Sequence, residues 1–326
     1  MTEPARNEQL IVAPYEGAVA DEWDALIRRS VNGTFLHSRR FLSYHASQFQ
    51  DRSILVRDLK GRLVGVLPVA EDPGNMANVT SHPGITYGGM IHDGSLVGAR
   101  MVAAFELIAD HYRQLGYRRL RYKVVPYAYH RIPAGDDLYA LFRLGAQRWR
   151  CDLTAIIDLE NRSRPRELRQ RSLKKAYESG VMVGEDWASV GEYWGVLQEV
   201  LLERHGVSPT HTLDEIELLH ARFPEQIRLV VAKIGDRVIA GAVLFALGPV
   251  LHSQYLATTS RGRELSALDP VVEFSIELAC TDGSRYFDFG ISNEEDDHRL
   301  NESLHRHKVS FGAGSMAHEH YDIHLA

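Results

Sequence analysis

Hydrophobic and polar positions repeat one arrangement twice along this chain. Residues 54–69 read as two apolar strands joined by a tight turn, and residues 228–245 read in the same way. After each hairpin come a short polar strand, an amphipathic helix, a glycine and an aromatic, basic strand, the last three within residues 107–125 and 274–292. The chain therefore reads as two copies of one β-hairpin–β–α–β unit, and we expect a substrate in a cleft between two related halves.

The duplication predicts two domains with an α/β (α+β) fold. The length of 326 residues fits two domains of about 150 residues each. We place the domains at residues 8–150 and 151–326, with a terminal strand at 315–326 that can pair back with the first domain. Helices are expected at residues 20–31, 34–49, 100–115, 137–145, 165–179, 188–205, 212–222 and 299–307.

Composition narrows the class of protein. With 44% hydrophobic and 25% charged residues, and no apolar stretch long enough to span a bilayer, the sequence is typical of a globular protein without a membrane partner. The polar N-terminus does not read as a secretory signal. Cys151 and Cys280 suggest neither a disulfide framework nor a zinc site, so we expect a cytoplasmic protein. A net charge of -6 argues against a nucleic-acid partner, and the sequence leaves a homo-oligomer open.

The segment after the strand at 250–259 is a first candidate site. It reads TSRGRELSALDP, and Asp269 followed by Pro270 is a strong signal for the start of a helix. A loop rich in Ser, Arg and Gly at a helix N-terminus offers backbone N–H groups and positive charge to a phosphate. An ordinary capped helix behind a solvated loop explains the same residues, and the spacing alone does not separate the two interpretations.

A second candidate site lies at residues 288–314. Asp288 lies at the end of a strand, and His305 and Lys308 are three residues apart, so they share one face of a helix. Glycines in the following SFGAG allow a ligand to approach the backbone, and a lysine beside a reacting carbonyl would stabilise developing negative charge. A lysine near a helix C-terminus also compensates the helix dipole, which is the commoner reason for finding one there.

The segment SHPGITYGGM at residues 81–90 is a third candidate, because loops with glycines and hydrogen-bonding side chains shape pockets. It contributes His82 and Tyr87, and Tyr127 and His130 follow the strand that closes this half of the chain. A glycine-rich loop can also be only a turn.

The sequence lacks the signatures of covalent and metal-dependent catalysis. It has no Gly-x-Ser-x-Gly elbow, P-loop or dinucleotide fingerprint, and neither cysteine lies in a catalytic motif. Histidines near the C-terminus match no zinc signature in their spacing; these are His298, His305, His307, His318 and His320. This leaves chemistry that needs no covalent enzyme intermediate, such as direct transfer of an activated group, and we expect no metal.

Five segments, taken together, carry a resemblance to a known family: SHPGITYGGM, RQRSLKKA, HSQYLATT, YFDFGIS and LNESLHRHKVSFGAG. In this order, and with the internal duplication, the chain resembles the tandem GNAT-fold acyltransferases, which include the Fem-type peptidoglycan aminoacyltransferases. It looks closer still to bacterial N-acyltransferases that modify nucleotide-linked amino sugars in polysaccharide biosynthesis. The resemblance covers nearly the whole chain and implies two GNAT-like domains, each a mixed, mostly antiparallel sheet flanked by helices.

The resemblance also implies the substrates: acyl-CoA as donor, the amine of a nucleotide-linked amino sugar as acceptor, and no permanently bound cofactor. Lys308, in KVSFG, matches a Fem-type Lys-x-x-Phe-Gly position that stabilises transfer. The base that takes the amine proton is left open among His305, Asp288 and His82. Donor contacts are implied at Tyr255, Leu256, Arg261, Gly262, Arg263 and Ser266. The resemblance implies acceptor contacts at Arg171, Lys174 and Lys175, and we also expect them at Tyr87, Tyr127, His130 and Asn301. The segment RGRELSA departs from the usual GNAT pyrophosphate signature, which puts the phosphate contacts in doubt.

Two alternatives stay open. One is a Fem-type transferase that takes aminoacyl-tRNA and acts on a cell-wall precursor. The chain has no room for the helical arm that such enzymes often carry, and its acidic balance disfavours a tRNA donor, but FemX-like members without the arm keep this alternative. The other is a catalytically silent GNAT-like module that binds a nucleotide sugar or a partner.

Overall fold

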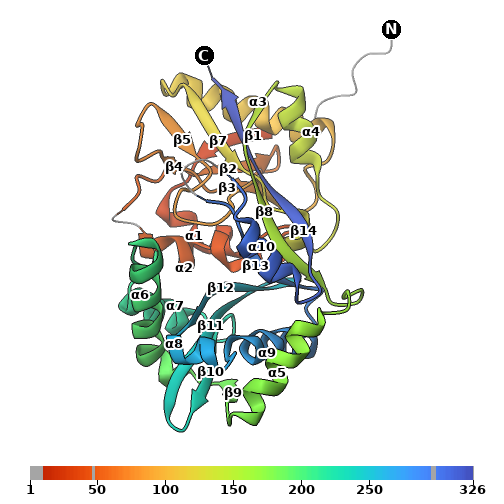
Figure 1. Ribbon diagram of the computed structural model, residues 1–326. Coiled ribbons are helices and arrows are strands. Elements are labelled where there is room, and N and C mark those ends of the chain that lie inside the picture. The colour runs from red at the N-terminus through yellow and green to blue at the C-terminus, as the bar shows by residue number, and fades with distance from the viewer. Residues whose placement is uncertain (1–9, 46–47, 295–298, 326) are drawn as a thin grey trace. The chain divides into compact units, whose positions relative to one another are not determined.

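The computed structural model describes residues 10–45, 48–294 and 299–325 (Figure 1). The chain divides into two compact units, unit 1 with Met1–Asp152 and Ala317–Ala326, and unit 2 with Leu153–Met316. The boundary falls within strand β8 (Gln147–Asp158) and again within strand β14 (Gly314–His324). Each unit has its own hydrophobic core. In the ranges given above, no helix combines the length and the apolar character that a bilayer span requires.

Unit 1 contains two sets of neighbouring strands in its described residues. An antiparallel sheet has the order β1-β2-β3-β6. Its strands are β1 (Leu10–Pro14), β2 (Ile54–Asp58), β3 (Leu63–Leu67) and β6 (Ile91–His92). The second set has the order β4-β5-β7-β14, in which β5 and β7 run parallel and the other neighbours antiparallel. Its remaining strands are β4 (Ala70–Glu71), β5 (Asn78–Thr80) and β7 (Arg119–Lys123).

The helices of unit 1 follow the apolar periodicity in most places. They are α1 (Ala20–Arg29), α2 (Arg39–Leu42), α3 (Ala99–Gln114) and α4 (Asp136–Arg143). The stripe predicted over 100–115 forms α3, which buries Phe105, Ile108 and Tyr112 in the core of the unit.

The prediction of one helix over residues 34–49 is wrong. In its place the structure has two short 3-10 turns around α2. Thr34 and Ser38 explain the break, because both have extended backbone, and the hydroxyl of Ser38 accepts a hydrogen bond from the N–H of Phe41 at 3.1 Å. Side chains that bond nearby backbone groups in this way compete with a continuous helix.

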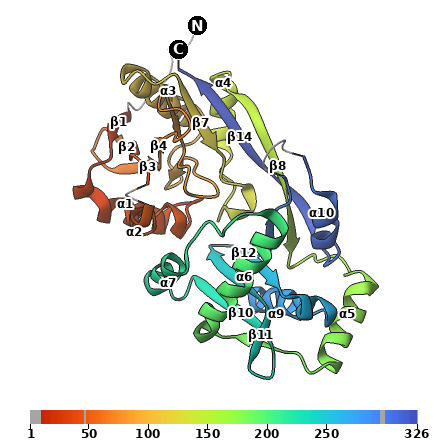
Figure 2. The same cartoon turned by 60° about the vertical axis from the view of Figure 1, so that its left-hand side comes forward.

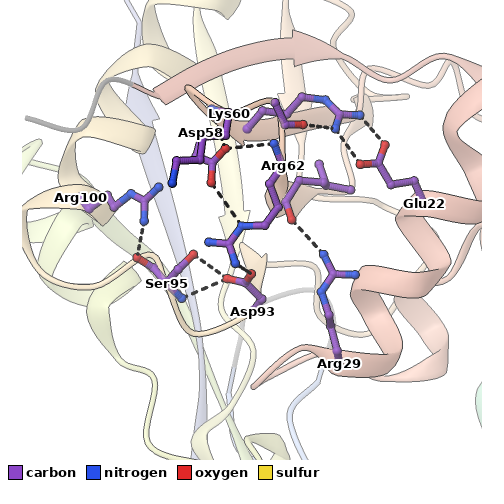
Figure 3. Close-up of polar contacts among 11 residues, drawn as sticks. Glu22, Arg29, Asp58, Lys60, Arg62, Asp93, Ser95 and Arg100 are labelled. Atoms are coloured by element: carbon purple, nitrogen blue, oxygen red, sulfur yellow. Dashed lines mark hydrogen bonds and ion pairs between the residues drawn. The ribbon is translucent and has the colours of Figure 1, made fainter.

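Polar contacts fix the β2–β3 hairpin of unit 1 to its surroundings (Figure 3). The Asp58 carboxylate accepts from the backbone N–H and the Nε of Arg62 across the turn, at 3.0 and 3.2 Å. The Arg62 guanidinium also lies 3.8 Å from the Asp93 carboxylate, and Arg29 of α1 donates to the Leu63 carbonyl at 2.9 Å. The hairpin is therefore held by hydrogen bonds within its own turn and by two polar contacts to segments that are distant in the sequence.

Unit 2 is a mixed sheet with the order β8-β13-β12-β11-β10-β9. Its further strands are β9 (Met182–Glu185), β10 (Ile227–Ile234), β11 (Arg237–Leu247), β12 (Val250–Thr258) and β13 (Tyr286–Ile291). Within the described part of the unit, only β12 and β13 pair in parallel. The helices are α5 (Glu167–Glu178), α6 (Val190–His205), α7 (Leu213–Arg222), α8 (Ser260–Glu264), α9 (Leu268–Thr281) and α10 (Glu302–Val309).

Helices cover both faces of the unit 2 sheet; α6 and α9 can be followed beside β10 to β12 in Figure 2. Ala240 and Ala242 of β11 share one core with Val271 of α9. The residue between them, Gly241, meets α6, since a Cβ at this position would lie 2.6 Å from the ring of Tyr193. Because successive strand residues face opposite sides, α6 and α9 pack on opposite faces.

A helix does start near Asp269 and Pro270, but Asp269 does not cap it, because α9 begins at Leu268 with Ala267 as its N-cap. The Asp269 carboxylate instead lies 2.7 Å from the guanidinium of Arg169 on α5. This ion pair draws the side chain away from the helix N–H groups that a capping aspartate would bind.

Candidate functional site

Two parallel strands of unit 2 separate partway along their length. β12 and β13 pair over three residues, ending at His252–Asp288. Beyond that pair, residues 253–258 of β12 and 289–291 of β13 make no pairing with each other, although all of them are described. We call these two separated strand ends the fork. On the β13 edge, Asp288 and Lys308 bind the backbone of Gly290 and Ile291, whereas the facing edge of β12 is not used in pairing with β13, so an extended ligand can bind along β12.

The fork opens at a β-bulge in β12. Against β11, Tyr255 pairs with Val243 and Ser253 pairs with Leu244, so Gln254 is an extra residue in β12. A bulge bends its strand, increases the local twist and re-aims side chains. The bulge therefore accounts for the departure of β12 from β13 at this point.

Lys308 of α10 lies at the β13 side of the fork. Its ammonium donates to the carbonyl of Gly290 at 2.9 Å and to that of Ile291 at 2.7 Å. The side chain is buried, which lowers the pKa of Lys308 to about 8 against the opposing influence of Asp288. A desolvated ammonium at a strand end can stabilise an oxyanion, and a pKa near neutrality lets it exchange a proton.

Asp288 is fully buried beside this lysine. Its Oδ1 accepts from the Thr154 hydroxyl and from the Gly290 N–H at 2.9 Å, and its Oδ2 lies 3.1 Å from Nδ1 of His252. The sequence pattern indicated Asp288 and gave no sign of Thr154, and His252 lies in the segment HSQYLATT without a role assigned to it. The signal that could have found His252 is its place in the strand HSQYLA, which pairs with the strand that carries Asp288.

Two serine hydroxyls add buried polar groups near the fork. Ser253 follows His252 in β12, and Ser292 follows the last residue of β13. Both side chains are buried, and among the described residues neither Oγ has a hydrogen-bond partner. Buried hydroxyls normally find a partner, so the strand ends offer polar atoms that a ligand could satisfy.

Helix α10 also carries two other residues of the predicted site. His305 is half-buried, its Nε2 lies 3.1 Å from the Ser315 hydroxyl, and burial together with the charge of Lys308 lowers its pKa. Asn301 was predicted to contact the acceptor. Its Oδ1 caps α10 by accepting from the N–H of Leu304 at 2.9 Å, which gives the residue a structural role.

The predicted donor contacts on β12 face different sides of the sheet. Tyr255 packs edge-on against Trp194 of α6, and its hydroxyl lies 2.6 Å from Nδ1 of His211. Burial raises the pKa of this phenol. Leu256 packs against the core that contains α9. The two side chains thus pack against helices and support the strand. A donor contact of these residues in the fork therefore concerns their backbone groups.

The predicted phosphate loop at 260–269 is not a loop. Its first part forms α8, capped by the hydroxyl of Thr259. Six backbone N–H groups of the segment bond to acceptors inside it or on Thr259, just before it: those of Gly262, Arg263, Leu265, Ser266, Ala267 and Asp269. Arg261 pairs with Glu264 at the surface. The free N–H groups predicted for a phosphate are therefore largely consumed by local structure.

The basic residues predicted to bind acceptor phosphates lie exposed on α5. Arg171 pairs with Glu167 and Lys174 with Glu178, one turn away on the same helix, and Lys175 is exposed. Such i,i+4 pairs are typical of a solvated helix face.

The remaining predicted residues belong to unit 1. Tyr87, a predicted substrate contact, is buried, with ring centroids 4.7 Å from Tyr129 and 5.7 Å from His37. His82 is buried, and its Nδ1 accepts from the Gly84 N–H at 3.2 Å. His130 Nε2 lies 2.9 Å from the Val125 carbonyl. Tyr127 is exposed.

Metal ligands are not gathered in the described ranges. There, no three His, Cys, Asp or Glu side chains are grouped closely enough to hold an ion. His298, one of the histidines considered for zinc, lies outside the described residues.

Comparison with known proteins agrees with the geometry of unit 2. The acetyltransferase (GNAT) domain family matches residues 162–299, which contain the fork. The fold is similar to that of FemX, with a TM-score of 0.67 at 13% identity over 96% of this chain and 97% of that one. It is also similar to L-PGS from Bacillus licheniformis, with a TM-score of 0.60 at 9% identity over 93% and 90%. A tandem GNAT protein from the clavulanic acid biosynthesis pathway gives a TM-score of 0.52 at 13% identity over 98% and 99%. Among curated proteins no match was found.

A mostly antiparallel sheet with one separating parallel pair, together with the family match, identifies unit 2 as a GNAT-type transferase domain. The chain as a whole has the Fem-like tandem GNAT fold. The predicted fold class, two GNAT-like domains with mixed sheets flanked by helices, is confirmed.

Proposed function

We propose that this protein is an N-acyltransferase that moves an acyl group from acyl-CoA to the amine of a nucleotide-linked amino sugar by direct attack. The observation that carries acyl transfer is the fork, with the Lys308 ammonium held by two carbonyls of β13 at its edge. The choice of acyl-CoA and of a sugar amine rests on the resemblance of the sequence motifs. The donor's acyl arm would lie along β12, where a backbone edge is open for it.

The transfer requires that the acyl carbonyl is held in a fixed position and that the negative charge forming on its oxygen is stabilised. Attack of the neutral amine on the acyl carbonyl makes a tetrahedral oxyanion. Backbone N–H groups near Tyr255 and Leu256, with the ammonium of Lys308, would stabilise this charge in a site that excludes much of the water. Release of the thiolate completes the exchange without an enzyme-bound intermediate.

A second candidate is a Fem-type transferase that takes an aminoacyl ester of tRNA. The local bonding of α8 favours it, because the pyrophosphate of CoA would find few free backbone N–H groups in the segment 260–267. The similarity of the fold to FemX is in line with this candidate, although it concerns the fold alone.

The test is a transfer assay with both donors. The purified chain is given acetyl-CoA or short acyl-CoAs with UDP- and dTDP-linked amino sugars, and free thiol is measured; in parallel, charged tRNA is given with a cell-wall precursor. Lys308→Met should slow the transfer at least tenfold, while Lys60→Met, at an exposed lysine in the turn between β2 and β3, should not. Transfer from tRNA without release of CoA thiol would replace the first candidate by the second, and no transfer from either donor would refute both.

A further inference from the structure

The carboxylate of Asp288 cannot itself reach a substrate. The side chain has no exposed surface, and both oxygens are in use, by Thr154, the Gly290 N–H and the His252 imidazole. A buried carboxylate needs such donors to stay ionised. Any effect of Asp288 on a reaction therefore passes through its hydrogen-bond partners. These partners lie on three strands: Thr154 on β8, His252 on β12 and Gly290 on β13.

One consequence concerns the protonation of His252. A carboxylate oxygen lies 3.1 Å from Nδ1, and this contact favours the imidazole tautomer that has its proton on Nδ1 and its lone pair on Nε2. The carboxylate also fixes the plane of the ring. The pair thus has the arrangement in which an acidic residue orients a histidine for proton transfer.

The position of the ring matters as much as its tautomer. His252 is the last residue of β12 that pairs with β13, so it lies where the fork begins. Phe287 and Phe289 of β13 belong to the α9 core, so Asp288 and its partner face the opposite side of the sheet. A Cβ built on Gly290 would lie 3.3 Å from Cε1 and 3.9 Å from Nε2 of His252. The basic edge of the ring therefore faces Gly290.

The same glycine anchors the lysine. The carbonyl of Gly290 accepts the Lys308 ammonium, and its N–H binds Asp288. Gly290 has a φ of 75°, which favours glycine, and any side chain would come between the ring edge and the backbone. The imidazole of His252 and the ammonium of Lys308 are thus both held next to Gly290, where the fork begins.

We propose that His252 is the proton acceptor of the transfer reaction, and that Asp288 and Thr154 are positioning residues that act through it. This proposal rests on the proposed N-acyl transfer. The amine nitrogen forms a bond to the acyl carbon while its proton passes to Nε2 of His252. The bond from the carbon to the leaving sulfur, or oxygen for an ester donor, then breaks. The proton moves from the imidazolium to that leaving atom, so the enzyme returns to its starting state.

Kinetics of matched variants test the assignment. His252→Gln should lower kcat at least 100-fold and change KM less than threefold, whereas His324→Gln, an exposed histidine of β14, should keep the rate of the wild type. Asp288→Asn should lower kcat at least tenfold. Thr154→Val should also lower it, and Thr154→Ser, which restores the hydroxyl, should recover most of it.

A spectroscopic measurement separates positioning from folding. Nitrogen-15 NMR of the labelled full chain should show His252 with its proton on Nδ1, a signal that disappears in His252→Gln and changes in Asp288→Asn while circular dichroism stays that of the wild type. An active wild type with an equally active His252→Gln, or a His252 signal with its proton on Nε2, would overturn this assignment alone. A wild type that transfers no acyl group from any donor would overturn the proposed function, and the assignment with it.

Discussion

Burial of Lys308 makes a quantitative prediction about stability at high pH. Its pKa falls from 10.5 in a free lysine to about 8, because most of the side chain is removed from water. At 1.36 kcal/mol per pH unit, this difference corresponds to about 3 kcal/mol between the native and unfolded states. Below pH 8 the lysine is charged in both states, and the native protein bears the full cost of the buried charge.

The sign of the pH dependence follows from proton binding. Between pH 8 and pH 10.5 the unfolded chain keeps a proton that the native protein has released, so the unfolded state binds more protons and the free energy of unfolding rises with pH. Lys308→Met lacks this group. The stability of the wild type relative to Lys308→Met should therefore increase by up to about 3 kcal/mol from pH 7 to pH 10.5.

Urea unfolding followed by circular dichroism measures this difference at each pH. At any one pH the variant also loses two hydrogen bonds to Gly290 and Ile291, which is why the slope and not the absolute difference is informative. Contributions of other titrating groups cancel in the comparison. Lys174→Met, on the exposed face of α5, should run parallel to the wild type. If Lys308→Met also runs parallel to it within about 0.5 kcal/mol, a threshold set by the usual scatter of additivity, the lysine is not desolvated and the reasoning fails.

Three further predictions use the same unfolding measurement. Gly290→Ala should cost about 1–2 kcal/mol or more, because its φ of 75° disfavours a side chain and the Cβ would meet the His252 ring; a neutral effect would contradict the described backbone. Gly262→Ala should cost at least about 1–3 kcal/mol, since its Cβ would lie 2.3 Å from the Ile239 carbonyl, whereas Gly195→Ala in α6, with nothing within 4 Å, should gain about 0.5–1 kcal/mol. Thr212→Ala should cost about 1 kcal/mol, because Thr212 and Glu215 form a capping box at α7, and Thr212→Ser should lose much less.

Local signals predicted most of the fold. The hairpins at 54–69 and 228–245 form β2–β3 and β10–β11, and the apolar stripe at 100–115 forms α3. These elements depend on periodicity within a few residues, which the sequence displays directly. The misplaced cap of α9 has a different origin, since the Asp269 carboxylate binds Arg169, a residue 100 positions away. A local cap signal cannot include such a partner.

The candidate site was only partly predictable for the same reason. Lys308 and Asp288 stand in motifs that match a family pattern, so a resemblance could point to them. His252 also stands in such a segment, HSQYLATT, but its contact with Asp288 became visible only when the parallel pairing of β12 and β13 joined residues 36 positions apart. Parallel strands require a long crossover, and their register is a tertiary property that neither strand encodes alone.

The contacts of Lys308 also bear on its two explanations. A lysine in the last turn of α10 would compensate the helix dipole if its ammonium lay near the C-terminal carbonyls of that helix or in solvent. The ammonium instead donates to two carbonyls of β13, and its burial opposes its own charge. Dipole compensation is worth at most about 1 kcal/mol for an exposed group and does not require burial. Burial of the charged Lys308 costs about 3 kcal/mol of stability. Its position beside the fully buried Asp288 carboxylate, at the fork, is better explained by a role in chemistry there.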